Sequence, residues 1–468
     1  MKSLRRCVVG AGAGAFALAT AAGTQEAKAA GFANTNAGGE QGTVVSTNPM
    51  ALYYNPGAMA FAKGSQLGLY GGLFIRHASW DRAGTKDDYP EPPAAQAANV
   101  GTNSLFNAFG GPSIGGTLKV GNLVLGAGFF APFGGRAHWG KNDAFVNSKY
   151  PLAAAGVQRW FSIDGAATVL YFTAGAAYRL GPLSIGATGN FISSTVDVTT
   201  ARKPSGANLP DTSAEGRAFT DAHTFNGSFA VGLMLELLPE QLYIGASYQA
   251  QPGLGQQALK GQLVVTSPQG NLAPTSVDFL QTLPDIYRAG VRWKPKHVPL
   301  EFRVFGDLTR WSEFKSQCVV LEGRPCDIAA DGSDNTPGGP VQTFLPRNWK
   351  DTYGARLGVS WWVVPPVELL FGGGYETAAS PDSTLAPDLP DAVSIQGTLG
   401  ARFMLTESLF LTASYTHIQQ MTRDNTGKST LAEDASGTAV LFPSNEEDAG
   451  GVYKSWIGVF TGNLEALF

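Results

Sequence analysis

Charged residues are scarce in this 468-residue sequence, at 15%, against roughly 25% in an ordinary soluble domain. After the N-terminal region, no segment has the run of about 18 uncharged apolar residues that a membrane helix needs. Glycine, at 59 residues, and aromatic residues, at 11%, are by contrast abundant. This composition favours a transmembrane β-barrel, in which only alternate residues face lipid. The alternative is a large secreted array of β-sandwiches.

Histidine and cysteine are also rare, with five and three residues. None of the histidines stands in the sequence context of a metalloprotease or serine-hydrolase motif, so we expect no catalytic residues, no cofactor and no enzyme activity. Cys318 and Cys326 lie close together in a polar stretch, which predicts a disulfide in an oxidising compartment. Because no histidine flanks them, we expect no metal site.

The N-terminus has the pattern of a secretory signal peptide over residues 1–29. Lys2, Arg5 and Arg6 precede an apolar run, and Ala27-Lys28-Ala29 supplies an A-x-A cleavage site. Its removal takes four basic and one acidic residue from totals of 33 and 37, leaving a net charge of about −7. A mildly acidic mature chain argues against nucleic acid as a partner.

Residues 65–468 divide into fourteen alternating segments that predict an antiparallel transmembrane barrel. Six very short connections occur at every second junction, which is the turn asymmetry of outer-membrane barrels. They are residues 121–122, 181–182, 239–241, 295–299, 364–366 and 406–408. In residues 284–295, Arg288 and Arg292 share a face that must point inward, because arginine against hydrocarbon costs about 2–4 kcal/mol.

Residues 30–64 do not alternate and contain the turn-forming pairs Asn48-Pro49 and Asn55-Pro56. A disordered tail would lack bulky apolar residues, whereas this segment contains Phe32, Leu52 and Tyr53 among others. We therefore predict an N-terminal hatch, residues 30–64, that plugs the barrel.

Several motifs in this order resemble the FadL family, the long-chain fatty acid and hydrocarbon uptake channels of Gram-negative bacteria. They are N-P-M-A-L-Y-Y-N-P-G-A-M-A at 48–60, G-A-G-F-F-A-P-F-G at 126–134, G-D-L-T-R-W-S-E-F at 306–314, N-W-K-D-T-Y-G-A-R-L at 348–357 and the proline-rich residues 375–390. The resemblance implies a monomeric fourteen-stranded barrel in the outer membrane, surrounded by lipid and lipopolysaccharide. It also implies a hatch, hydrophobic small molecules as ligands, and lateral exit next to the third strand.

Pro132 is the most informative residue of that third strand. Because proline has no N–H to donate, we expect either a kink or bulge near residues 131–135, opening a lateral gap beside Phe133 and Gly134, or the end of the strand. Asn55-Pro56 is interpreted either as a gating element of the hatch or as an ordinary turn.

A fatty acid needs an apolar channel and one group that binds its carboxylate. The candidate cations are Arg288, Arg292 and Arg303, with Arg159, Arg356 and Lys260 as further candidates, although pairing with interior carboxylates such as Asp307 is the competing role. The candidate apolar residues are Phe106, Phe109, Phe129, Phe305 and Trp311, although packing in the aromatic girdle or against the hatch is the competing role for each. The alternative function is a porin for small polar solutes, which has the same strand pattern but needs no hatch.

Overall fold

The computed structural model describes residues 43–83, 97–202, 215–267, 270–329, 333–430 and 449–468. The predicted signal peptide and the first part of the predicted hatch, residues 30–42, lie outside these ranges. No helix within the described ranges is long and apolar enough to cross a membrane. The helices are short: α2 (Ala51–Tyr54), η2 (Pro56–Phe61), η3 (Asp143–Phe145), η4 (Pro151–Ala155), η5 (Val157–Trp160), η6 (Pro252–Leu254) and η7 (Trp311–Glu313).

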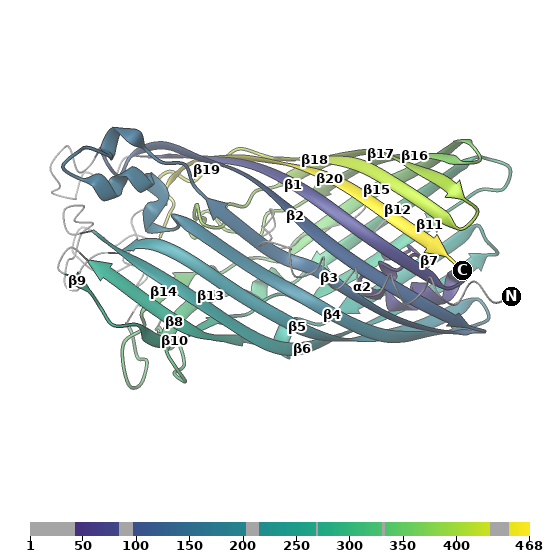
Figure 1. Cartoon of the computed structure of the whole chain (residues 1–468), viewed down its shortest axis with the longest axis horizontal. Coiled ribbons are helices and arrows are strands. Elements are labelled where there is room, and N and C mark those ends of the chain that lie inside the picture. The colour runs from purple at the N-terminus through teal and green to yellow at the C-terminus, as the bar shows by residue number, and fades with distance from the viewer. Residues whose placement is uncertain (1–42, 84–96, 203–214, 268–269, 330–332, 431–448) are drawn as a thin grey trace, which may run out of the picture.

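The strands form one closed antiparallel barrel (Figure 1). They are β1 (Gln66–Arg82), β2 (Gly101–Val120), β3 (Leu123–His138), β4 (Asp164–Leu180), β5 (Leu183–Arg202), β6 (Gly216–Leu238), β7 (Leu242–Gln249), β8 (Gln257–Ser267), β9 (Gly270–Asn271), β10 (Thr275–Gln281), β11 (Ile286–Trp293), β12 (Leu300–Thr309), β13 (Ser316–Leu321), β14 (Thr343–Pro346), β15 (Thr352–Val364), β16 (Val367–Glu376), β17 (Ser394–Thr406), β18 (Leu409–Gln420), β19 (Arg423–Asp424) and β20 (Gly451–Leu467). β20 pairs with β1 along its length and closes the wall.

Four strands of the wall are each built from two segments: β7 and β8, β10 and β11, β12 and β13, and β14 and β15. Counting each pair once, and treating β9 and β19 as short extensions, gives the predicted barrel of fourteen strands. The breaks in these four neighbouring strands surround a buried aromatic cluster. Trp311, Phe314 and Trp349 lie there with ring centroids 4.9 to 5.8 Å apart.

The connections have the predicted asymmetry. Two to six residues join β2 to β3, β4 to β5, β6 to β7, β11 to β12, β15 to β16 and β17 to β18, and the other connections between consecutive members of the fourteen wall strands are longer. We call the two ends of the barrel the short-turn end and the long-loop end. α2 and the C-terminus lie at the short-turn end in Figure 1.

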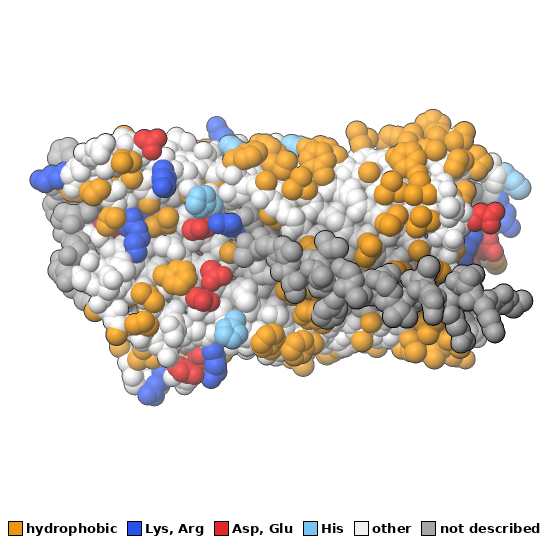
Figure 2. Space-filling view, in the orientation of Figure 1, with side chains coloured by type: hydrophobic (Ala, Val, Ile, Leu, Met, Phe, Trp, Pro, Cys, Tyr) orange, Lys and Arg blue, Asp and Glu red, His pale blue; other side chains and the backbone are white. Residues whose placement is uncertain are grey.

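The outer face of the wall is apolar, as the alternation predicted. Phe172 and Tyr178 of β4 are exposed, whereas Tyr171 and Thr173, the two chain neighbours of Phe172, are buried. On β11 the exposed residues are Tyr287 and its alternate neighbours, so Arg288 and Arg292 point inward. Figure 2 shows hydrophobic side chains over much of this face, while charged side chains gather mainly toward the long-loop end.

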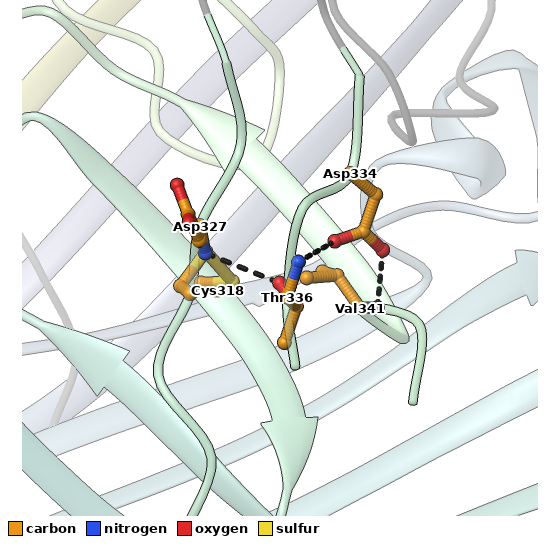
Figure 3. The surroundings of a disulfide bond; sticks show 6 residues. Cys318, Asp327, Asp334, Thr336 and Val341 are labelled. Carbon is orange, nitrogen blue, oxygen red and sulfur yellow. Dashed lines mark hydrogen bonds between the residues drawn. A yellow bond between two sulfur atoms is a disulfide. The ribbon is translucent and has the colours of Figure 1, made fainter. Parts of the chain in front are cut away.

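The predicted disulfide joins Cys318 of β13 to Cys326 in the following loop. In the same loop, the Asp334 carboxylate accepts hydrogen bonds from the backbone N–H groups of Thr336 (2.9 Å) and Val341 (2.7 Å) (Figure 3). The covalent link and these hydrogen bonds hold the loop at the long-loop end of β13.

Candidate functional site

The described part of the hatch, residues 43–64, lies inside the barrel near the short-turn end. Residues 49–60 are buried without exception. The Asn55 side chain donates hydrogen bonds to the carbonyl oxygens of Val44 (2.7 Å) and Leu233 (2.9 Å) and accepts one from Gly57 N–H (3.0 Å). Asn55 therefore caps η2 at its N-terminus and also ties the hatch to β6. Pro56 follows at the first position of η2, where its missing N–H costs nothing.

The wall that faces Asn55 and Pro56 is lined by glycine because the hatch backbone approaches it closely. A Cβ at Gly186 of β5 would lie 2.5 Å from Pro56 C, and one at Gly245 of β7 would lie 2.6 Å from Val44 O. Two wall hydroxyls add hydrogen bonds to the hatch: Ser184 Oγ to Gly57 O and Ser247 Oγ to Tyr54 O, both 2.6 Å. On this side the hatch is held by steric fit and hydrogen bonds together.

Pro132 lies in a β-bulge and not at the end of a strand. In the β3–β4 ladder, Phe130 pairs with Tyr171 but Phe133 pairs with Val169, so β3 contains one extra residue at this point. The strand continues past the bulge to His138. Of the two expectations, the bulge is correct, and its physical reason is that proline cannot donate to a regular ladder.

The ladder between β2 and β3 does not continue to the long-loop side of this bulge. The β2–β3 ladder ends at the Ile114–Phe129 pair, although β2 stays paired with β1 and β3 with β4. The Asn107 side chain spans the far end of the gap: it donates to His138 O (3.1 Å) and accepts from His138 N–H (3.2 Å). We call the edge residues between these two contacts, 108–113 of β2 and 130–137 of β3, the window.

The β2 edge of the window contains a second proline, Pro112, in the sequence Gly110-Gly111-Pro112. Prolines on both edges reduce the number of N–H groups available for pairing, which is how natural sheets protect unpaired edges. Pro112 was not among the residues predicted from sequence, although a proline inside a long alternating segment is a signal that could have identified it.

A cavity of about 110 Å³ lies inside the barrel behind the window. Residues 135–137 of β3 line it directly. Most of the other lining is apolar and comes from β4, β5, β6, β10 and β13, with Ala167, Val196, Ala218, Phe279 and Val319 as examples. The polar exceptions include Arg136, 3.4 Å from Asp164, and Asp388, which is paired with Arg347.

The predicted cations do not line this cavity. Arg288 lies over the rings of Tyr53 and Tyr54, with its guanidinium carbon 5.0 and 5.5 Å from their centroids. Arg292 and Arg303 both pair with Glu301, at 3.0 and 2.9 Å. The further candidates also have carboxylate partners: Arg159 pairs with Glu215, Arg356 with Asp307, and Lys260 with Glu322.

Two of the candidate apolar residues do not point into the barrel. Phe129 and Phe106 point to the outer face of the wall, as their alternative role in the aromatic girdle requires: the ring of Phe129 packs at a tilt beside that of the exposed Phe172, with ring centroids 5.2 Å apart, and Phe106 is 65% exposed. Regular alternation is the reason: Phe106 alternates with the buried Leu105 and Asn107 on β2, and Phe129 precedes the bulge on β3. Phe133 and Gly134, beyond the bulge, are buried within the window.

The whole chain can now be compared with known proteins. A family model described as "Outer membrane protein transport protein (OMPP1/FadL/TodX)" matches residues 10–447. The chain belongs to this family. Members of the FadL/TodX family are outer-membrane channels for hydrophobic substrates, so the chain is an outer-membrane transport barrel.

Solved structures of FadL-type proteins share the fold. A Pseudomonas aeruginosa FadL homologue superimposes with a TM-score of 0.72 at 16% identity, covering 94% of this chain and 100% of its own. The P. putida toluene transporter TodX gives 0.63 at 15%, with 95% and 99% covered. The Ralstonia pickettii toluene transporter TbuX gives 0.55 at 15%, with 94% and 97% covered. No curated protein sequence matches the chain significantly.

Proposed function

We propose that this FadL-family channel takes up hydrophobic small molecules, fatty acids or hydrocarbons, and releases them sideways through the window while the hatch blocks the straight route. Uptake is passive and is coupled to ligand binding through the hatch. The protein acts as a monomer among outer-membrane lipids and lipopolysaccharide. The observation that carries the proposal is the loss of β2–β3 pairing beside an interior apolar cavity.

The window supports lateral exit on physical grounds. An apolar molecule in the cavity gains nothing by entering water, but it loses no hydrophobic stabilisation by passing directly into lipid. Residues 135–137 lie on β3 beyond the end of the β2–β3 ladder, and they also line the cavity. One short segment thus connects the interior site to the outer face.

The hatch supports gating. Asn55 and the glycine-lined wall hold residues 49–60 near the short-turn end. Arg288 links the two hatch tyrosines to the wall. A ligand that displaces this segment must overcome these few contacts, so we infer that binding in the interior shifts the hatch without unfolding the barrel.

The test removes the extra residue of the bulge. Deleting Ala131 restores regular register between β3 and β4, so β3 can pair with β2 and the window closes. Both proteins are expressed in cells that lack a channel of their own. With the deletion variant, we expect the uptake of labelled fatty acid and of labelled toluene to be about tenfold or more below that with the wild type. Unchanged uptake of both would refute lateral exit.

A matched control is the bulge between β15 and β16, where Val363 is the extra residue next to a short turn. Deleting Val363 alters register far from the window, and we expect uptake to persist. Assembly of both variants is checked by the heat-dependent shift of folded barrels on gels.

The porin alternative is separated by a second measurement on the same protein. In proteoliposomes, rapid sugar-driven swelling without transfer of hydrophobic molecules would favour a porin. The hatch argues against it, because an open diffusion pore has no need for a buried plug.

A further inference from the structure

The barrel interior has a polar side as well as an apolar one. The inner faces of β3 to β8 contain Phe130, Tyr171, Ile192, Val196 and Leu259, all buried and apolar apart from the tyrosine hydroxyl. The inner faces of β17, β18 and β20 contain hydroxyl and amide groups in their short-turn half, and the apolar Ile418, Ile457 and Val459 lie beyond them. Thr398 and Thr416 are hydrogen-bonded at 2.8 Å, and Ser414 and Thr461 at 2.6 Å.

A chain of charges crosses this polar side near the short-turn end. It alternates in sign along the wall from β11 to β20 and ends on the hatch, in the order Arg292, Glu301, Arg303, Glu368, Arg402, Glu465 and Asn48. Successive distances are 3.0, 2.9, 3.8, 3.7, 2.9 and 2.8 Å. We call this chain the charge ladder.

The charge ladder lines a cavity of about 210 Å³ beneath hatch residues 45–48. Four buried polar atoms on its lining residues have no hydrogen-bond partner among the described residues: Asn48 Oδ1, Gln66 Oε1, Arg292 Nε and Arg402 Nε. Buried polar atoms of this kind are normally satisfied by water, and the cavity is large and polar enough to contain several molecules. The cavity is therefore suited to water and ions and not to a hydrophobic ligand.

A second charged layer lies farther inside the barrel. Arg356 pairs with Asp307 and, at 3.2 Å, with Glu376. On β12 the inward positions run Arg303, Phe305, Asp307, so one apolar residue separates the two layers.

The hatch packs against Phe305, the residue that separates the two charged layers. Val44 packs on Gly290, the residue between Arg288 and Arg292 on β11: a Cβ at Gly290 would lie 2.8 Å from Val44 Cγ1. Val44, Val45 and Phe305 form one small buried apolar cluster, which we call the seal. The seal separates the charge ladder from the second charged layer.

We propose that the cavity lined by the charge ladder and the second charged layer together form a second, hydrophilic route for small inorganic ions, closed at the seal and opened when hatch residues 43–48 move. A short apolar constriction between hydrated layers blocks ions because they would have to shed water there. The charge ladder sets the ion selectivity of the route. This route differs from the window in position and in ligand chemistry, and it does not depend on lateral exit of hydrophobic molecules.

The experiment measures ion current through the full mature protein in planar bilayers in a KCl gradient. Val44→Ala with Phe305→Ala removes the seal, and we expect the current to rise about tenfold or more over wild type. Phe74→Ala is the matched control, because it removes the same phenyl group from the buried wall of β1, away from the hatch. We expect it to leave the current at the wild-type value.

The reversal potential distinguishes the proposed route from a general leak. In the seal-free protein, Glu301→Gln should shift selectivity toward chloride and Arg402→Gln toward potassium. Val44→Ser, which leaves the wall intact, replaces the double variant if the latter does not assemble. Seal variants that conduct no more than Phe74→Ala would overturn the proposal. A reversal potential that neither Glu301→Gln nor Arg402→Gln changes would also overturn it.

Discussion

Asn55→Ala gives the sharpest prediction for the hatch. The Asn55 side chain is fully buried and makes three hydrogen bonds, to Val44 O, Leu233 O and Gly57 N–H. Alanine removes all three hydrogen bonds. At about 1 kcal/mol for each bond, the seated hatch loses about 3 kcal/mol relative to a displaced hatch. Since each 1.4 kcal/mol is about a tenfold change in equilibrium, the displaced population rises roughly 100-fold.

Amide hydrogen exchange measures this population directly. We expect exchange in residues 50–62 to accelerate about 100-fold in Asn55→Ala, while the wall strands stay protected. Asn190→Ala is the control: Asn190 is also a buried asparagine, hydrogen-bonded to Thr173 (2.7 Å) and Ser228 (3.1 Å), but it lies on the wall of β5. Hatch exchange that is equal in the two variants would refute the reasoning that Asn55 holds the hatch.

Three other predictions concern the hatch wall and the loops. Gly232→Ala places a Cβ against the Asn55 side chain, 3.0 Å from its Cγ, and such overpacking costs about 1–3 kcal/mol, so hatch exchange should accelerate. Cys326→Ser opens the short disulfide-closed loop after β13, and we expect faster proteolysis there, since the lost constraint amounts to about 2–3 kcal/mol in the loop-entropy model. The hydrogen bonds that Arg423 and a neighbouring lysine donate lower the pKa of Asp382; because the folded-state pKa is depressed, this loop contact contributes stability at neutral pH and is lost as pH falls below about 4.

Each of these has its own check. Gly189→Ala is the control for Gly232→Ala, because a Cβ at Gly189 meets nothing within 4 Å; equal exchange in both would contradict the steric argument. For the disulfide, reductant applied to the wild type should reproduce the cleavage pattern, and no change would contradict it. For Asp382, Asp382→Asn should abolish the acid-induced rise in exchange of residues 377–393, and a persisting rise would point to another group.

The barrel was predictable from sequence because its signals are local. Short turns such as residues 121–122 and alternation such as that around Phe172 depend on neighbours in the chain. The bulge at Pro132 was foreseen for the same reason, since the missing N–H belongs to the residue itself.

The interior was not predictable in the same way. Which partner an inward arginine finds depends on register between strands: Arg292 and Arg303 converge on Glu301 because β11 and β12 pair at those positions. Phe129 was a candidate for the interior, but it precedes the bulge and keeps the outward position that regular alternation gives it. The charge ladder and the cavity behind the window likewise join residues that are hundreds of positions apart in the chain.

Lateral exit through the window, as proposed, would limit the shape of the cargo. Asn107–His138 at one end and Ile114–Phe129 at the other are contacts within the wall that bound the window. Between them lie six residues of β2, a length of about 20 Å at roughly 3.3 Å per residue. The window is therefore long in the direction of the strands. If cargo leaves there, an elongated molecule would leave lying parallel to β2, and the window would select cargo by its thickness across the strands and not by its chain length.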